Sequence, residues 1–102
     1  MLKVFISQPM NGKTDEHILK EREMLTSFAK ERYGDDIEIV DSFFNSFSKD
    51  AKPLFFLGES IKALSKADVA YFAKDWQSAR GCRIEHQCAL EYGLEVVECY
   101  KY

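Results

Sequence analysis

The chain has 102 residues, of which 46% are hydrophobic and 14% aromatic, and it carries a formal net charge of −3. This composition predicts one soluble domain over residues 1–102, with a single core and no basic surface that would bind a nucleic-acid polymer. No apolar run approaches the roughly 20 residues that span a bilayer, and the opening apolar stretch is too short for a signal peptide. We therefore expect a cytoplasmic protein without a membrane partner.

The N-terminal part of the chain is predicted to form a strand, a loop and a long helix. A β-rich run covers residues 3–7, and proline and glycine mark a loop over residues 8–13. Thr14 is a suitable N-cap for the helix that follows, because acidic side chains then occupy its first turn, where the helix dipole favours them. The amphipathic stripe of this helix should end at Gly34, which can supply a left-handed C-cap.

The rest of the chain continues the alternation of strand and helix. Further strands are predicted at residues 37–41, 68–73 and 94–100, and further helices at 53–64 and 81–92. Strands that alternate with helices imply right-handed crossovers and a parallel sheet covered on both faces. The predicted fold class is therefore a small three-layer α/β domain with a four-stranded parallel sheet.

Three loops should meet at one edge of this sheet. They follow the first three strands, at residues 7–13, 41–48 and 74–80, and ligands of open α/β sheets bind beyond the carboxyl ends of the strands. In the first loop Ser7, Gln8, Pro9 and Met10 precede a glycine, and such a loop can present backbone N–H groups to a phosphate. The alternative is a turn that merely requires proline and glycine.

Motifs for nucleotide cofactors are absent from the sequence. Neither the P-loop pattern nor the Gly-x-Gly-x-x-Gly pattern of dinucleotide-binding proteins occurs. We therefore expect no cofactor. The three cysteines, Cys82, Cys88 and Cys99, have no Cys-x-x-Cys spacing, which favours packed free thiols over a disulfide or a metal site.

Glu85 is the first candidate for chemistry. It falls just inside the N-terminus of the last predicted helix and shares a helical face with Cys82, Cys88 and Ala89. A helix buries such a face, and a buried carboxylate is unfavourable unless it is hydrogen-bonded or used in function. The alternative is an ordinary solvated glutamate near a helix start.

The loop before this helix holds the other candidates. Asp75 can accept a proton or bind the edge of a nucleobase, and Trp76 can cover a flat ring, although a lone tryptophan is often a core residue. Arg80 flanks Gly81 and can pair with a phosphate or with Glu85, or it can be a surface charge at a helix start.

Several short motifs resemble the nucleoside 2-deoxyribosyltransferase superfamily, above all its short members that phages and prophages often encode. The matching segments are residues 5–9 (Phe-Ile-Ser-Gln-Pro) before a long helix, residues 67–72 with Asp75, and residues 81–85 (Gly-Cys-Arg-Ile-Glu). The resemblance implies a flavodoxin-like sheet. It also implies that Glu85 is the nucleophile and that Asp75 holds the nucleobase. Three positions depart from the family pattern: Phe5 replaces a tyrosine that orients the nucleophile, Cys82 replaces a threonine, and Ala79 replaces an acidic residue.

The resemblance further implies a reaction and a substrate site. The glutamate attacks the anomeric carbon of a nucleoside or nucleotide, the base departs with a proton delivered by Asp75 or by water, and a second base or water resolves the glycosyl-enzyme. The predicted catalytic residues are Glu85 and Asp75, and the predicted substrate-binding residues are Phe5, Ser7, Gln8, Pro9, Met10, Asp41, Trp76, Arg80 and Gly81.

Two functions of different classes stay open from the sequence. The first is an enzyme that cleaves or transfers an N-glycosidic bond, and the second is a non-catalytic protein that sequesters a nucleotide-derived signal in the same crevice. A homo-oligomer is expected in either case, because aromatic residues favour interface cores. The aromatic residues concerned are Phe43, Phe44, Phe47, Phe55 and Phe56.

Overall fold

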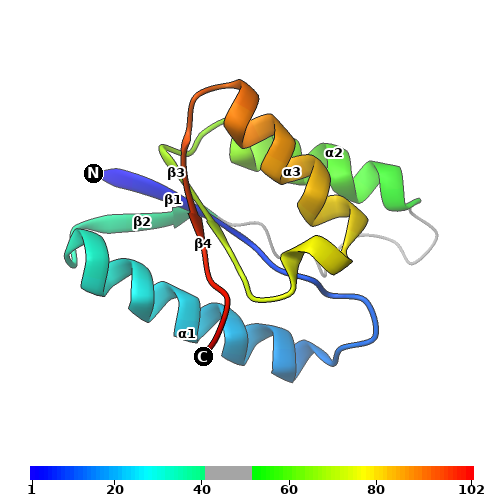
Figure 1. Ribbon diagram of the computed structural model, residues 1–102, viewed down its shortest axis with the longest axis horizontal. Coiled ribbons are helices and arrows are strands. Elements are labelled where there is room, and N and C mark those ends of the chain that lie inside the picture. The colour runs from blue at the N-terminus through cyan, green and yellow to red at the C-terminus, as the bar shows by residue number, and fades with distance from the viewer. Residues whose placement is uncertain (41–51) are drawn as a thin grey trace.

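A four-stranded parallel sheet forms the centre of the protein. The computed structural model describes residues 1–40 and 52–102. Its strands are β1 (Leu2–Ser7), β2 (Ile37–Val40), β3 (Val69–Phe72) and β4 (Glu95–Glu98), arranged in the order β2-β1-β3-β4 (Figure 1). The long helix and the two shorter ones are α1 (Asp15–Tyr33), α2 (Pro53–Leu64) and α3 (Arg80–Glu91). The predicted three-layer α/β/α, flavodoxin-like fold is confirmed.

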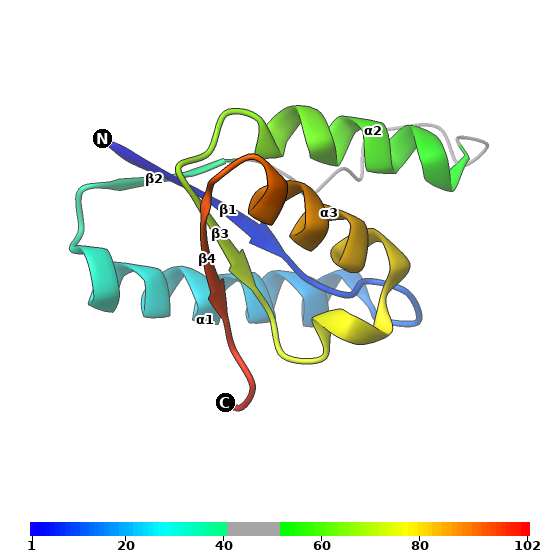
Figure 2. The same ribbon diagram turned by 45° about the horizontal axis from the view of Figure 1, so that its top comes forward.

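The helices cover both faces of the sheet. Helix α1 lies on one face of the sheet, and α2 and α3 lie together on the other, as Figures 1 and 2 both show. None of the helices within residues 1–40 and 52–102 combines the length and apolarity that a bilayer span requires.

Local signals in the sequence fix the ends of α1. The hydroxyl Oγ1 of Thr14 accepts a hydrogen bond from the backbone N–H of His17 at 3.1 Å, which confirms the predicted N-cap. At the other end Gly34 has a φ of 90° and donates its N–H to the carbonyl of Lys30. A positive φ is accessible to glycine without steric strain, so the helix ends where the sequence predicts.

The alternation of side chains along β1 places consecutive residues in different layers. Val4 and Ile6 pack into the core on the α1 side, with Leu25 of α1, whereas Phe5 packs into the core on the α2 and α3 side. Ser7, at the end of β1, continues the face of Phe5. The last residue of the strand therefore points its side chain into the space between the sheet, α2 and α3.

Candidate functional site

A cleft of about 770 Å³ opens at the carboxyl end of β1. One wall is the loop after β1, a second is the N-terminal half of α2, and a third is the beginning of α3. The lining residues are Phe5, Ile6, Ser7, Gln8, Pro9, Met10, Asn11, Pro53, Leu54, Phe56, Leu57, Ser60, Ala79, Arg80, Gly81, Cys82, Ile84 and Glu85. The cleft thus lies at the sheet edge where parallel α/β folds bind ligands.

Glu85 is held in this cleft by Ser7. The Ser7 hydroxyl donates a hydrogen bond of 2.6 Å to Oε1 of Glu85, and both side chains are buried, with 2% and 7% exposed. The contact joins residues 78 positions apart in the sequence, through the fold alone. The structure therefore brings together two of the predicted site residues, one from β1 and one from α3.

Burial shifts the ionisation of Glu85. Desolvation raises the pKa of its carboxyl from 4.5 to about 6, while the hydroxyls of Ser7 and Ser60 lower the pKa by stabilising the charged form. Within the described residues no cation forms an ion pair with Glu85. Above pH 6 the cleft consequently contains a negative charge that no described cation pairs, beside largely apolar walls.

Gln8 belongs to the wall of the cleft, but its side chain is committed elsewhere. Its Nε2 donates to Oε1 of Glu21 at 2.8 Å and to the Ile18 carbonyl at 3.2 Å, and its Oε1 accepts from Nη1 of Arg22 at 3.1 Å. These partners all lie on α1. The Gln8 amide, which the sequence predicts to bind a ligand, instead connects the loop after β1 to α1.

The beginning of α3 offers donors for an anion. Arg80 is exposed where α3 lines the cleft, and Ala79 at the N-cap position provides no side-chain acceptor for the first N–H groups of the helix. Gly81 follows in the first turn. Uncapped N–H groups and a guanidinium together suit a phosphate or a carboxylate.

Asp75 and Trp76 do not line the cleft. A 3₁₀ turn at Trp76–Ser78, which the periodicity of the sequence did not reveal, places Asp75 at an exposed position with a φ of 67°. Trp76 turns inward and is 8% exposed. Its ring stacks on the ring of His86, with centroids 4.0 Å apart, and lies against the ring of Phe72, with centroids 5.6 Å apart.

Some predicted residues fall outside the described part of the chain. These are Asp41 of the substrate site and Phe43, Phe44 and Phe47 of the aromatic cluster. Of the rest of that cluster, Phe55 is exposed and Phe56 lines the cleft.

The site residues predicted from the sequence include none from α2. Leu54, Leu57 and Ser60 line the cleft from this helix. Their spacing of three residues puts them on one helical face, which was a detectable signal, but nothing in the sequence says that this face borders Glu85.

The cysteines are unpaired, as predicted. Cys82, which lines the cleft, is buried, and this burial raises the pKa of its thiol to about 11. A thiol with such a pKa is a poor nucleophile near neutral pH. Within residues 1–40 and 52–102, no group of three or more His, Cys, Asp or Glu side chains is arranged to hold a metal ion.

No model of a known protein family, no curated protein and no solved structure matches this chain. The cleft and the residues that line it are therefore the basis for a function.

Proposed function

We propose that this protein cleaves or transfers the N-glycosidic bond of a nucleoside or nucleotide, with Glu85 as the nucleophile. The observation that carries the proposal is a buried carboxylate, held by Ser7 in a cleft of about 770 Å³, within the usual size range of small-molecule sites. The resemblance of residues 81–85 to the nucleophile motif of the deoxyribosyltransferase superfamily supports the same assignment.

The first chemical step forms one bond and breaks another. An oxygen of the Glu85 carboxylate bonds to the anomeric carbon while the bond to the base nitrogen breaks, and the base leaves with that electron pair. Positive charge develops on the sugar ring in the transition state. The unpaired negative charge of Glu85 stabilises it, more strongly among apolar walls than in water.

The second step opens the ester between Glu85 and the sugar. Attack by water at the anomeric carbon, with its proton passing to the hydroxide left by the first step, gives free sugar and makes the protein a hydrolase, whereas attack by the ring nitrogen of a second base, which loses its proton in the same way, makes it a transferase. In both cases the Glu85 carboxylate is regenerated.

The departing base needs a proton, and we propose that water delivers it. Among the described cleft residues the titratable side chains are Arg80, Cys82 and Glu85. Burial keeps Cys82 protonated with a pKa of about 11, and Glu85 must be ionised to attack. Asp75, the proton donor suggested by the sequence, lies outside the cleft lining.

The walls suggest how a substrate lies. Met10, Phe56 and Leu57 offer apolar surface for a base, and Arg80 with the first turn of α3 suits a 5′-phosphate.

A second function, binding without turnover, is favoured by one observation. The described cleft residues include no side chain that is protonated at neutral pH and acidic enough to protonate a leaving base. In that case the same cleft would sequester a nucleotide.

A substrate panel tests the proposal and separates the two functions. Deoxynucleosides, ribonucleosides and their 5′-monophosphates are incubated with the wild type, and free base is followed by chromatography. We expect release by the wild type and a rate at least about 10³-fold lower for Glu85→Ala, because the variant lacks the nucleophile.

The matched control is Glu91→Ala, which removes an exposed glutamate from the same helix and should leave the rate unchanged. Binding without base release by the wild type would support sequestration. Neither binding nor release across the panel would contradict both functions.

A further inference from the structure

The polar side chains that are buried in the described part of the chain flank the carboxyl end of β1. Among the described residues, four polar or charged side chains are buried: Ser7, Gln8, Glu21 and Glu85. They form two pairs, Ser7 with Glu85 and Gln8 with Glu21. Since Ser7 and Gln8 are consecutive, the two buried carboxylates are held by neighbouring residues on opposite sides of the sheet.

Glu21 has no place in the reaction described above, yet it is as buried as Glu85. Both are 7% exposed. Oε1 of Glu21 accepts from Gln8 at 2.8 Å and lies 3.7 Å from Nζ of Lys13, and Oε2 accepts a hydrogen bond from the Tyr102 hydroxyl. A buried carboxylate with this many partners is fully satisfied and rigid, whereas losing one partner is unfavourable.

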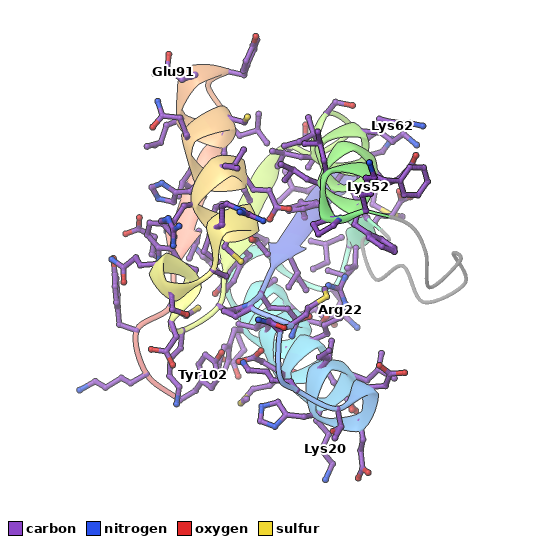
Figure 3. The ribbon with its side chains drawn as sticks, turned by 90° about the vertical axis from the view of Figure 1, so that its right-hand side faces the viewer. Lys20, Arg22, Lys52, Lys62, Glu91 and Tyr102 are labelled. Atoms are coloured by element: carbon purple, nitrogen blue, oxygen red, sulfur yellow. The ribbon has the colours of Figure 1, made fainter. Side chains whose placement is uncertain are left out.

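Tyr102 reaches Glu21 from the far end of the chain. It follows β4 and lies beside α1 in Figure 3, 81 positions from Glu21 in the sequence. Its ring contacts Phe28 with centroids 5.9 Å apart, and its hydroxyl accepts a hydrogen bond of 3.2 Å from the N–H of Lys74. Tyr102 is 37% exposed, and its partial desolvation together with Glu21 raises the pKa of the phenol, so the hydroxyl remains a donor at neutral pH.

The effect of Tyr102 can be followed to the reactive carboxylate through three hydrogen bonds and one peptide bond. Tyr102 fixes Glu21, Glu21 fixes the amide of Gln8, and Gln8 is bonded through the backbone to Ser7, which holds Glu85. The Gln8 amide also bonds to the Ile18 carbonyl and to Arg22, so the residue after β1 is attached to α1 by side-chain contacts.

We propose that Tyr102 is a positioning residue for Glu85, acting through Glu21 and Gln8 on Ser7. The inference rests on the proposed function of Glu85. It assigns a role in the reaction to a side chain that does not line the cleft, on the opposite face of the sheet from Glu85.

The test compares two tyrosines of the same segment. Tyr102→Phe removes the hydroxyl that contacts Glu21, and Tyr100→Phe removes a hydroxyl that donates to exposed Glu98 at 2.8 Å. We expect Tyr102→Phe to lower kcat for base release about tenfold with KM changed less than about twofold, because misplacing Glu85 affects the transition state rather than binding. Tyr100→Phe should leave both constants unchanged.

A carboxyl titration of Glu85 by NMR provides a second readout. A loosened Ser7 hydrogen bond should raise the pKa of Glu85 above its value of about 6 in Tyr102→Phe and leave it unchanged in Tyr100→Phe. If Tyr102→Phe does not fold, Glu21→Leu, which removes both acceptor oxygens, breaks the same chain of contacts and should shift kcat and the pKa in the same directions.

The possible outcomes distinguish a failure of this inference from a failure of the proposed function. A lower unfolding temperature for Tyr102→Phe with unchanged kcat and unchanged Glu85 pKa would make Tyr102 a purely structural residue and overturn the inference. A wild type that releases no base overturns the proposed function instead. The titration then decides whether Tyr102 positions Glu85, and an unchanged pKa of Glu85 in Tyr102→Phe would again contradict the inference.

Discussion

Replacing Glu85 with glutamine should lower base release by at least about 10³-fold and, at neutral pH, stabilise the fold by about 2 kcal/mol. The loss of activity follows from the proposed role of Glu85 as the nucleophile. The gain in stability follows from burial, because the wild type holds a charged carboxylate where desolvation raises its pKa from 4.5 to about 6. Opposite effects of one substitution on activity and stability are typical of a side chain retained for function.

The gain should depend on pH in a defined way. Folding raises the pKa of Glu85, so this carboxyl binds more protons in the folded than in the unfolded protein between pH 4.5 and about 6, and its contribution to wild-type stability falls as pH rises through this range. The advantage of Glu85→Gln is thus absent below pH 4.5, grows up to about pH 6 and is constant above it.

Urea unfolding of both proteins at pH 4 and pH 7.5 measures the effect. Glu91→Gln serves as the control, because Glu91 is exposed and its replacement should change the free energy of unfolding little at either pH. If Glu85→Gln is no more stable than the wild type at pH 7.5, burial in the cleft does not destabilise the charged form of this carboxylate.

Trp76→Ala should lower the free energy of unfolding by about 3–5 kcal/mol. Trp76 is 8% exposed and packs against Phe72 and His86, so truncation leaves a cavity between β3 and α3. Such a loss is a large part of the total stability of a domain of this size. Urea unfolding measures this loss. Circular dichroism is the signal to follow, because the protein has one tryptophan and the variant has none, so tryptophan fluorescence cannot report on its unfolding.

Trp76→Phe distinguishes a core residue from a ligand platform. Phenylalanine keeps most of the packing, so this variant should fold and retain wild-type affinity for whichever nucleoside or nucleotide the panel identifies. A strong loss of affinity in a folded Trp76→Phe protein would place the indole against the ligand and contradict its assignment to the core.

Local signals explain why much of the fold could be predicted. Thr14 and Gly34 end α1 through contacts within one or two turns, so the residue types alone fix the boundaries. The burial of Glu85 was also predictable, because small apolar residues share its helical face and are buried with it.

Other features depend on contacts that no local pattern encodes. Asp75 adopts a left-handed conformation in a 3₁₀ turn that redirects Trp76 into the core. Gln8 finds its partners on α1, up to 14 positions away, rather than in the cleft. Tyr102 meets Glu21 across 81 positions of the sequence.

Glu21 is a residue that sequence reasoning could have found. It lies on the same buried stripe of α1 as Ile18, Leu25 and Ala29, where an acidic side chain is out of place. The argument that singled out Glu85 applies equally to Glu21. A carboxylate on the apolar face of a helix is thus a useful marker of a polar network, whether or not it is catalytic.

Mass spectrometry of a trapped intermediate tests the role of Glu85 most directly. A nucleoside with fluorine at C2 of the sugar disfavours positive charge on the ring and slows breakdown of the glycosyl-enzyme. After incubation with the wild type, we expect base released in proportion to protein and one sugar attached to the peptide that contains Glu85. Release of base with the sugar on another residue, or on none, would contradict Glu85 as the nucleophile.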